Sequence, residues 1–433
     1  MKVSILTLFP KLYDEFLQTS LVSRAQENGI VQFDMVSFFS YVESKKRIDA
    51  PTFGPGAGML LKPEVVEKAI EDKDRQFGES YKIFFSPHGT TLDQRLVRKL
   101  AQKVQEKKHL MLISPRYEGM DSRVESYYAD EIISIGDYVL MGGDLPAMVL
   151  LEALLRLMPG VVGKEESVAK ESFSGVFVDY PEFTEPVEWK GMKVPEVIRS
   201  GNHAAIEKWR TQQAAKRTVL HHFDWIKSSK PTPEQKKLIK TFIPPHYLAL
   251  MHSGVVLRDN SEGTTSVTSL DLHDIARSAC MYAIERYFIV TPLVDQQKIV
   301  QQILDFWASD VAISYNPHRH EAVSRISVVD ELDTTISQIE QYHGKKPILI
   351  ATSARWPELS QKITYNDQSL VWESGRPVLI LLGTGGGLSQ QILSRCDFIL
   401  IPLEGFSDFN HLSVRSAAAV ILDRWLGISP NNF

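Results

Sequence analysis

Two glycine turns lie close together between Ile132 and Leu150, in the stretch IISIGDYVLMGGDLPAMVL. Glycine adopts backbone conformations that other residues avoid, so the turns GDY and GGD can form loops with little side-chain bulk. The main-chain N–H and C=O groups of such loops can wrap a flat ligand. Taken alone, the same stretch also fits an ordinary strand-to-helix connection with turn glycines.

A second glycine-rich segment, FGPGAGM, places Gly54, Gly56 and Gly58 at alternate positions ahead of a helix that starts at Pro63. A loop of this kind can hold a phosphate group or let a ligand approach the backbone. It is not a P-loop, because no GK[ST] follows, and it lacks the GxGxxG spacing of a dinucleotide site. A nicotinamide-dependent oxidoreductase therefore has only weak support.

The elements that must position these turns alternate between strand and helix. Strands are expected over residues 3–8, 31–38, 82–85, 110–113 and 132–135, with helices from Pro10 through Leu21 and over residues 92–104. This alternation predicts an α/β domain with a parallel sheet and with ligand loops at the carboxyl ends of its strands. The loops 86–90, 114–121 and 135–145 follow consecutive strands, so we expect them to converge on one ligand.

The chain changes character beyond Pro159. Residues 161–175 are polar and contain Gly and Ser, which predicts a flexible interdomain linker. Residues 176–240 are expected to form a helical domain, in which Lys208 and Arg210 belong to a run of cations around Trp209. A basic helical module suits an RNA backbone, although a solvated helix face is the plain alternative.

A new α/β pattern begins at Tyr247 and continues to residue 433. Its late part repeats the order seen in the first domain, which is a glycine-containing loop, a short amphipathic run, a strand, a turn and an apolar helix. This repetition predicts two similar domains, 1–160 and 247–433, in one chain.

The composition is that of a soluble globular protein, with 43% hydrophobic residues, 23% charged residues and a net charge of −5. No apolar run approaches the ~20 residues of a membrane span. The start, MKVSILTLFP, reads as a buried strand rather than as a secretory signal. Cys280 and Cys396 offer no metal-ligand spacing and suggest a reducing cytosol, so we expect a cytoplasmic protein.

Five motifs carry a resemblance to a known family. In order over residues 1–240, FGPGAGM, SPRYEGMD, SIGDYVLMGGDLPAM, PGVVG and SGNHAAIEKWR resemble the bacterial tRNA (guanine-N1)-methyltransferase family, TrmD. From Tyr247 on, DLHDIARSA, ATSAR, LGTGGGL and NHLSVRSAAAVILDR resemble bacterial SPOUT-type RNA methyltransferase-like domains. The chain resembles a fusion of the two, with two SPOUT-type α/β domains separated by a small helical RNA-binding domain.

The resemblance implies a fold, an activity and a set of partners. It implies a trefoil knot at the carboxyl end of each α/β domain, S-adenosylmethionine as the cofactor in the knotted loops, and a homodimer with its sites at the interface. It implies methylation of N1 of the guanine at tRNA position 37, with Mg²⁺ as a candidate additional cofactor. It does not imply an RNA target for the second domain.

The resemblance also assigns candidate residues by position. The cofactor contacts of the first domain are Ser86, Pro87, Gly89, Pro115, Tyr117, Glu118, Gly119, Ile135, Gly136, Asp137, Tyr138, Val139, Leu140, Gly142, Gly143 and Pro146. The candidate tRNA contacts are Asp179, Asn202, His203, Lys208 and Arg210. The candidate cofactor loops of the second domain contain Gly383, Gly385, Leu403, Asn410, Leu412 and Ser413.

The implied reaction needs a base and a cation. Neutral guanine carries a proton on N1, so a base must remove it as the methyl group arrives, and a cation must stabilise the charge that builds toward O6. Arg156 matches the family's arginine, whereas Glu171 stands where the family has Asp, and Pro115 stands where it usually has Gly. Because Glu171 reaches one methylene further, a re-tuned enzyme, a slow enzyme and a non-catalytic RNA-binding protein all stay open. A solvated linker carboxylate is the plain alternative role of Glu171.

Overall fold

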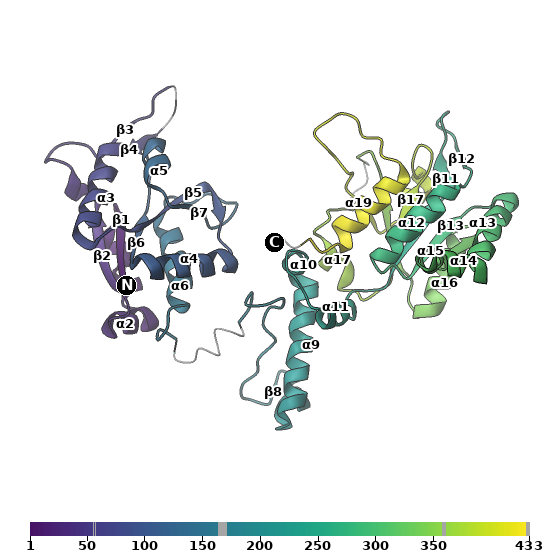
Figure 1. The fold of residues 1–433 in the computed structure, drawn as a ribbon, viewed down its shortest axis with the longest axis horizontal. Helices are drawn as coiled ribbons and strands as arrows, with labels where there is room; N and C mark the ends of the chain where they lie inside the picture. Colours follow the sequence, from purple (N-terminus) through teal and green to yellow (C-terminus); the bar gives the residue numbers. More distant parts are fainter. Residues whose placement is uncertain (55, 57, 163–170, 357–360, 430–433) are drawn as a thin grey trace. The chain divides into compact units, whose positions relative to one another are not determined.

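The computed structural model describes residues 1–54, 56, 58–162, 171–356 and 361–429. The chain divides into two compact units, unit 1 from Met1 to Ser174 and unit 2 from Gly175 to Phe433. Each unit contains one large parallel sheet with helices packed around it (Figure 1). The predicted α/β fold with parallel sheets is therefore confirmed.

Unit 1 is built on five parallel strands in the order β2-β1-β6-β5-β7. Its interior strand β1 is buried on both faces, because Val3 and Ile5 pack in one core and Leu6 packs in the other. The elements of unit 1 are β1 (Lys2–Thr7), η1 (Pro10–Tyr13), α1 (Asp14–Leu17), α2 (Ser20–Glu27), β2 (Gln32–Ser37), η2 (Phe38–Tyr41), β3 (Asp49–Pro51), β4 (Met59–Leu61), α3 (Pro63–Phe77), β5 (Tyr81–Thr91), α4 (Gln94–Lys107), β6 (His109–Ile113), α5 (Ser122–Tyr128), β7 (Glu131–Ser134) and α6 (Asp144–Arg156).

Helix α4 shows how local sequence fixes an element. The Asp93 side chain caps the helix by accepting a hydrogen bond from the backbone N–H of Leu96, at 2.8 Å. Leu96, Leu100 and Val104 then recur every four residues and are buried against the sheet. The helix ends at Lys108, whose left-handed backbone breaks the helical path before β6 begins.

Two predictions for unit 1 are corrected. The single helix expected from Pro10 through Leu21 is wrong, because η1, α1 and α2 replace it and Thr19 between them is extended. Strand β5 is longer than expected, since it continues to Thr91. Thr90 and Thr91 pair again with β7 after an irregularity, so the predicted ligand loop at residues 86–89 bulges out of a continuing strand.

Unit 2 is built on seven parallel strands in the order β14-β13-β10-β17-β15-β18-β16. Its elements up to residue 307 are β8 (Glu188–Trp189), β9 (Met192–Lys193), α8 (Glu196–Arg199), α9 (His203–His221), α10 (Phe223–Lys227), α11 (Pro233–Lys240), β10 (His246–Met251), β11 (Ser253–Val256), β12 (Glu262–Thr264), α12 (Ser269–Met281), β13 (Arg286–Val290) and α13 (Val294–Trp307). The remaining elements are α14 (Asp310–Tyr315), α15 (Pro317–Val323), β14 (Ile326–Val329), α16 (Leu332–His343), β15 (Ile348–Thr352), β16 (Lys362–Ile363), α17 (Gln368–Trp372), β17 (Val378–Gly383), α18 (Gln390–Leu393), β18 (Phe398–Leu400) and α19 (Val414–Leu426).

The two sheets share one arrangement of five strands. The order β2-β1-β6-β5-β7 in unit 1 corresponds to β13-β10-β17-β15-β18 in unit 2. In both units the first of the five strands lies second in the row, between the second and the fourth, and the last of the five lies at the far end. A 13-residue helix follows that last strand in each, α6 in unit 1 and α19 in unit 2. The internal repetition of the sequence thus has a counterpart in the fold.

The basic helices belong to the same core as the second sheet. Val219 at the end of α9, Phe223 and Ile226 in α10 and Ile239 in α11 lie in one apolar cluster with residues of β10, β17 and α19. The division of the chain at residue 174 therefore leaves the helical segment in unit 2. Of the predicted linker at 161–175, residues 163–170 lie outside the described part of the chain. No described helix is long and apolar enough to cross a membrane.

A buried histidine, His246, joins these elements through hydrogen bonds. His246 donates from Nδ1 to the Pro244 carbonyl at 2.6 Å, and its Nε2 accepts from the indole N–H groups of Trp372 at 3.3 Å and Trp425 at 3.0 Å. Burial lowers the pKa of His246 from 6.5 to about 4, because the charged imidazolium is poorly solvated there.

Unit 2 is therefore expected to lose stability as the pH falls from 6.5 to 4, the range in which the unfolded chain binds a proton at His246 and the folded chain does not. This histidine alone contributes about 3 kcal/mol to the loss. All seven tryptophans lie in unit 2, so urea denaturation followed by tryptophan fluorescence measures it. His246→Phe should reduce the acid dependence without removing it, because burial also lowers the pKa of His252 in this unit to about 4. An unchanged dependence in that variant would contradict the assignment.

Candidate functional site

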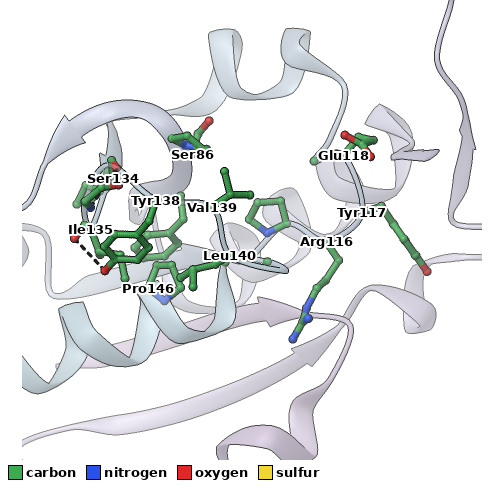
Figure 2. Close-up of a pocket in the computed structure, with 18 residues that line it drawn as sticks. Ser86, Arg116, Tyr117, Glu118, Ser134, Ile135, Tyr138, Val139, Leu140 and Pro146 are labelled. Atoms are coloured by element: carbon green, nitrogen blue, oxygen red, sulfur yellow. Dashed lines mark hydrogen bonds between the residues drawn. The ribbon is translucent and has the colours of Figure 1, made fainter. Parts of the chain in front are cut away.

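Three loops of unit 1 line one pocket (Figure 2). They follow the buried part of β5, the end of β6 and the end of β7, as parallel strands that share an edge require. The cavity has a volume of about 240 Å³. Its lining consists of Phe85, Ser86, Pro87, Pro115, Arg116, Tyr117, Glu118, Gly119, Ile133, Ser134, Ile135, Gly136, Tyr138, Val139, Leu140, Gly142, Gly143 and Pro146.

All but two of the residues predicted as cofactor contacts in this unit lie in that lining. The exceptions are Gly89, which packs against β7, and Asp137, which follows Gly136 in the third loop. The prediction missed four lining residues, Phe85, Arg116, Ile133 and Ser134. Three of them are strand residues that precede the predicted loops, so extending each loop back into its strand would have found them.

The pocket has an apolar side and a polar side. Figure 2 shows Tyr138 and Glu118 at opposite ends of the group of lining residues. Tyr138 folds back on its own loop, and its hydroxyl donates to the Ile135 carbonyl at 3.2 Å. Val139, Leu140 and Pro146 add apolar surface, whereas Glu118 adds a carboxylate.

The glycine-rich segment ahead of α3 lies beside Glu118. The backbone N–H of Glu118 donates to the Met59 carbonyl at 3.2 Å, and that of Leu61 donates to the Gly119 carbonyl at 3.1 Å. A methyl group on Gly58 would collide with the Glu118 side chain, and Gly58 also has a positive φ of 99°. Residues Gly58 to Leu61 therefore pack against the second pocket loop at Glu118 and Gly119. The close approach at Gly58 leaves no room for a side chain.

Gly89 holds two strands of the pocket wall close together. A Cβ atom at this position would lie 2.6 Å from the Ile133 backbone nitrogen and 2.7 Å from the Ile132 carbonyl. We expect Gly89→Ala to lower the free energy of unfolding by about 1–3 kcal/mol and to weaken ligand binding, because β5 and β7 must move apart. Urea denaturation with hydrogen exchange of unit 1 peptides measures the first effect.

The matched control is Gly175→Ala, since a methyl group there meets nothing within 4 Å and the backbone has no positive φ. Equal behaviour of the two variants would contradict the close-approach role of Gly89.

A buried carboxylate ties the pocket loops to the sheet. Asp144, fully buried at the start of α6, accepts from Arg116 Nε at 2.8 Å and from the Thr7 hydroxyl at 2.6 Å. It also accepts from the Tyr13 hydroxyl at 3.2 Å. Burial, together with the nearby Asp144 charge, raises the pKa of Tyr13 far above its usual value, so this hydroxyl stays a donor. The Arg116 guanidinium in turn lies over the Phe9 ring, 4.8 Å from its centroid.

The two predicted catalytic residues contact each other. The Arg156 guanidinium donates from Nε to Glu171 Oε2 at 2.9 Å and from its second arm to Oε1. This two-pronged pair fixes both side chains in one plane. Neither residue lies in the pocket lining of the same chain. Pro146 at the pocket and Arg156 are ten residues apart on α6, which corresponds to about 15 Å.

The predicted tRNA contacts occupy the first part of the helical segment. Asn202 caps α9 by accepting from the Ala205 N–H at 3.1 Å, and His203 begins the helix with an exposed side chain. Lys208 is exposed, whereas the Arg210 guanidinium lies 4.6 Å from the Tyr180 ring centroid.

Asp179, the fifth predicted tRNA contact, lies near this helix, since its carbonyl accepts from Arg217 at 3.4 Å. Asn202 and Arg210 thus have structural contacts of their own, and Lys208 and His203 present polar groups to solvent.

The candidate residues of the second domain lie in loops after β17 and β18. Gly383 ends β17, and Gly385 has a positive φ of 59° in the loop that follows. The Asn410 amide donates to the Ala354 carbonyl at 2.6 Å, which joins the loop after β18 to the loop after β15.

The other three candidates, Leu403, Leu412 and Ser413, precede or follow Asn410 in the segment between β18 and α19. Ser413 caps α19, Leu412 is exposed, and Leu403 packs against the core. Among the described residues, no group of three His, Cys, Asp or Glu side chains is placed to hold a metal ion.

Two family models match consecutive parts of the chain, and the first match extends past the division between units at residue 174. The family model described as tRNA (Guanine-1)-methyltransferase TrmD matches residues 1–228. The model described as SAM-dependent RNA methyltransferase matches residues 245–427. Residues 229–244, which contain α11, separate the two matches, and the second match begins just before β10.

Individual relatives extend this result. The tRNA (guanine-N(1)-)-methyltransferase of Nitratidesulfovibrio vulgaris is 36% identical over 433 residues, which is 99% of both chains. That of Bacillus subtilis is 41% identical over 241 residues, which is 55% of this chain and 98% of the relative. The crystal structure of tRNA (m1G37) methyltransferase from Aquifex aeolicus is 32% identical, with a TM-score of 0.41, and covers 48% of this chain and 87% of that one. The chain therefore belongs to the tRNA (guanine-1)-methyltransferase family TrmD, in a form that carries a second, SAM-dependent RNA methyltransferase domain.

Proposed function

We propose that unit 1 methylates N1 of the guanine at position 37 of tRNA and takes the methyl group from S-adenosylmethionine. The observation that carries the proposal is the convergence of three loops on one pocket, in a chain of this family. The relatives from Nitratidesulfovibrio vulgaris and Bacillus subtilis are named tRNA (guanine-N(1)-)-methyltransferase, which specifies the same base and the same nitrogen.

The pocket residues fit S-adenosylmethionine. Val139, Leu140 and Pro146 offer apolar surface for an adenine ring, and the Glu118 carboxylate suits an ammonium group. The Asp144–Arg116 ion pair holds the second and third loops against each other, so the cradle is preformed. When bound there, the cofactor supplies an electrophilic methyl group on a sulfonium sulfur.

Glu171 is proposed to take the N1 proton, and Arg156 to stabilise the negative charge on O6. A carboxylate is basic enough for the task when the proton leaves as the new bond forms. The two-pronged contact with Arg156 holds the Glu171 carboxylate in a defined orientation. The longer side chain of Glu, relative to the family's Asp, still places its carboxylate on the Arg156 guanidinium. We therefore favour an active enzyme over a non-catalytic RNA-binding protein.

A homodimer would bring these pieces together. The Arg156–Glu171 pair and the pocket lie at opposite ends of α6, about 15 Å apart, so a second protomer is needed to supply the pair to the pocket. The surface beside the pocket is apolar enough for such an interface. Val139 is 88% exposed, Met141 is 87% exposed, and Leu145 and Val149 are exposed on one face of α6.

Further properties follow from the family resemblance. We propose that a trefoil knot of SPOUT type closes around the loops of residues 115–119 and 135–143 in unit 1, and a second one around the loops after β17 and β18. The second domain would hold S-adenosylmethionine with Gly383, Gly385 and Asn410, together with Leu403, Leu412 and Ser413. We also propose that the protein is cytoplasmic and that Lys208 and His203 bind tRNA. Mg²⁺ is proposed as an additional cofactor of the reaction.

The test compares two tRNA transcripts that differ only at position 37. The full-length protein is incubated with labelled S-adenosylmethionine and a transcript carrying G37 or A37, and the nucleosides are identified by mass spectrometry. The proposal predicts N1-methylguanosine from the G37 transcript and none from the A37 transcript. N1-methylguanosine at another position, or methylation of another guanine atom, would overturn it.

A further inference from the structure

The helical segment and the second methyltransferase domain form one body. Phe223 of α10 packs edge-on against Trp372 of α17, with ring centroids 4.8 Å apart. Val219, Ile226 and Ile239 lie in the same buried cluster as the strands of the second sheet. A shared core of this kind moves as a unit, because neither part can separate without exposing its apolar surface to water.

Polar contacts fix the same junction. The Lys227 ammonium group donates to the carbonyls of Tyr365 at 3.2 Å and Arg424 at 2.8 Å. In return, the Ser429 N–H donates to the Lys227 carbonyl at 2.8 Å. Burial lowers the pKa of Lys227, against the effect of Asp224. The ammonium group is thus half-buried between the helices and the second domain, where its hydrogen bonds fix the angle between them.

Helix α9 presents two lysines to solvent. Its 19 residues correspond to a length of about 28 Å, and the helix extends away from the second sheet (Figure 1). Lys208 and Lys216 are exposed along it. An RNA backbone held on α9 would therefore stand in a fixed geometry relative to the second domain, whereas unit 1 is a separate compact unit.

We infer that the second domain methylates the same tRNA molecule that the helices hold for unit 1, at a nucleotide other than position 37. The inference rests on the proposed function of unit 1. The nucleotide's nucleophilic nitrogen or oxygen forms the new bond to the methyl carbon, the carbon–sulfur bond breaks with its electrons left on sulfur, and the nucleophile's proton passes to solvent. The products are the methylated nucleotide and S-adenosylhomocysteine.

The strands of the second sheet separate the helical segment from the candidate methylation loops of the second domain. Phe223 of α10 packs on Trp372, whose indole N–H donates to His246 at the start of β10. The candidate methylation loops follow the other ends of the strands, where Met251 pairs with Gly383. Six-residue strands make this distance about 17 Å. The tRNA segment that reaches these loops is therefore remote from the one on α9.

The loop edge of the second domain is suited to an unpaired nucleotide. Phe409 is 76% exposed and Trp356 is 55% exposed, near the contact between Asn410 and Ala354. The Lys362 ammonium group lies 5.6 Å from the Trp356 ring centroid. Exposed aromatic rings beside a cation can stack on a base and hold its phosphate. This arrangement favours a nucleotide in a loop of the tRNA over one inside a helix.

The experiment uses the full-length protein and a pool of unmodified tRNA transcripts, each carrying A at position 37. Unit 1 then has no guanine at that position to methylate. We expect labelled methyl groups to enter the tRNA pool at one position other than 37. Asn410→Ala should lower the rate of this transfer more than tenfold. Asn410→Ala should still form N1-methylguanosine at position 37 of a G37 transcript, which shows that the variant is folded.

A charge-reversal pair tests the shared substrate. Lys208→Glu with Lys216→Glu should weaken both methylations by about tenfold, because both depend on α9. Lys298→Glu on α13, an exposed lysine of the same unit, is the matched control. The inference is overturned if no methyl group enters the A37 pool, or if the α9 pair slows only the reaction at position 37. Failure of the proposed function has a separate signature, the absence of N1-methylguanosine from wild-type reactions with G37 transcripts.

Discussion

Replacing Glu171 by Gln is expected to slow methyl transfer to G37 by about 10²–10⁴-fold. The amide keeps the size of the side chain and can still accept one hydrogen bond from Arg156, but it cannot take the N1 proton. Binding of S-adenosylmethionine should not change, since Glu171 lies outside the pocket lining of its own chain. Single-turnover kinetics with labelled cofactor measure the rate, and calorimetry measures the affinity.

Two further variants sharpen this result. Glu171→Asp keeps a carboxylate but retracts it by one methylene, so its rate should lie between those of the wild type and Glu171→Gln. Glu152→Gln removes an exposed carboxylate one turn before Arg156 on α6 and should leave the rate unchanged. A Glu171→Gln enzyme that keeps the wild-type rate would remove Glu171 from the mechanism.

Asp144→Ala is expected to lower the free energy of unfolding of unit 1 by about 3–5 kcal/mol. The substitution leaves the Arg116 guanidinium, whose side chain is only 20% exposed, without its carboxylate partner. It also takes the carboxylate acceptor from the buried Thr7 hydroxyl and removes one of three partners of the Tyr13 hydroxyl. Because Arg116 holds the second pocket loop, cofactor binding should weaken as well. Hydrogen exchange of unit 1 peptides at rising urea concentration measures the stability.

The ion pair itself can be separated from the rest of the network. Asp144→Ala with Arg116→Met removes both charges, so the double variant should be less destabilised than the sum of the two single variants. Arg116→Met alone leaves Asp144 with its two hydroxyl donors and should cost less than Asp144→Ala. Strictly additive effects would contradict coupling between the two side chains.

Much of unit 1 could be predicted from the sequence because its signals are local. Buried strands with continuous apolar runs, and glycine turns after them, placed the three pocket loops on one edge of a parallel sheet. The spacing of Leu96, Leu100 and Val104 predicted α4. The motif resemblance then identified the family, which the matches over residues 1–228 and 245–427 confirm.

What the sequence did not reveal depends on contacts between distant residues. The continuation of β5 past its bulge reflects pairing with β7, which lies far along the chain. Asp144 is not among the predicted site residues, because its partners Thr7 and Arg116 are 137 and 28 residues away along the chain. The shared core of the helices and the second sheet was likewise hidden, since basic composition predicted a separate module.

The central claim is that the pocket of one protomer and the Arg156–Glu171 pair of another make one site for methylation of G37. The direct measurement uses heterodimers of a Glu171→Gln protomer and a Gly143→Leu protomer, purified through two different tags. In Gly143→Leu the new side chain would meet Pro115, whose Cδ lies 2.6 Å from the position of a Cβ, so its pocket is blocked. Each homodimer should be inactive, and the heterodimer should regain about half of the wild-type rate, because one of its two sites is complete. An inactive heterodimer, or protomers that do not associate, would contradict the account.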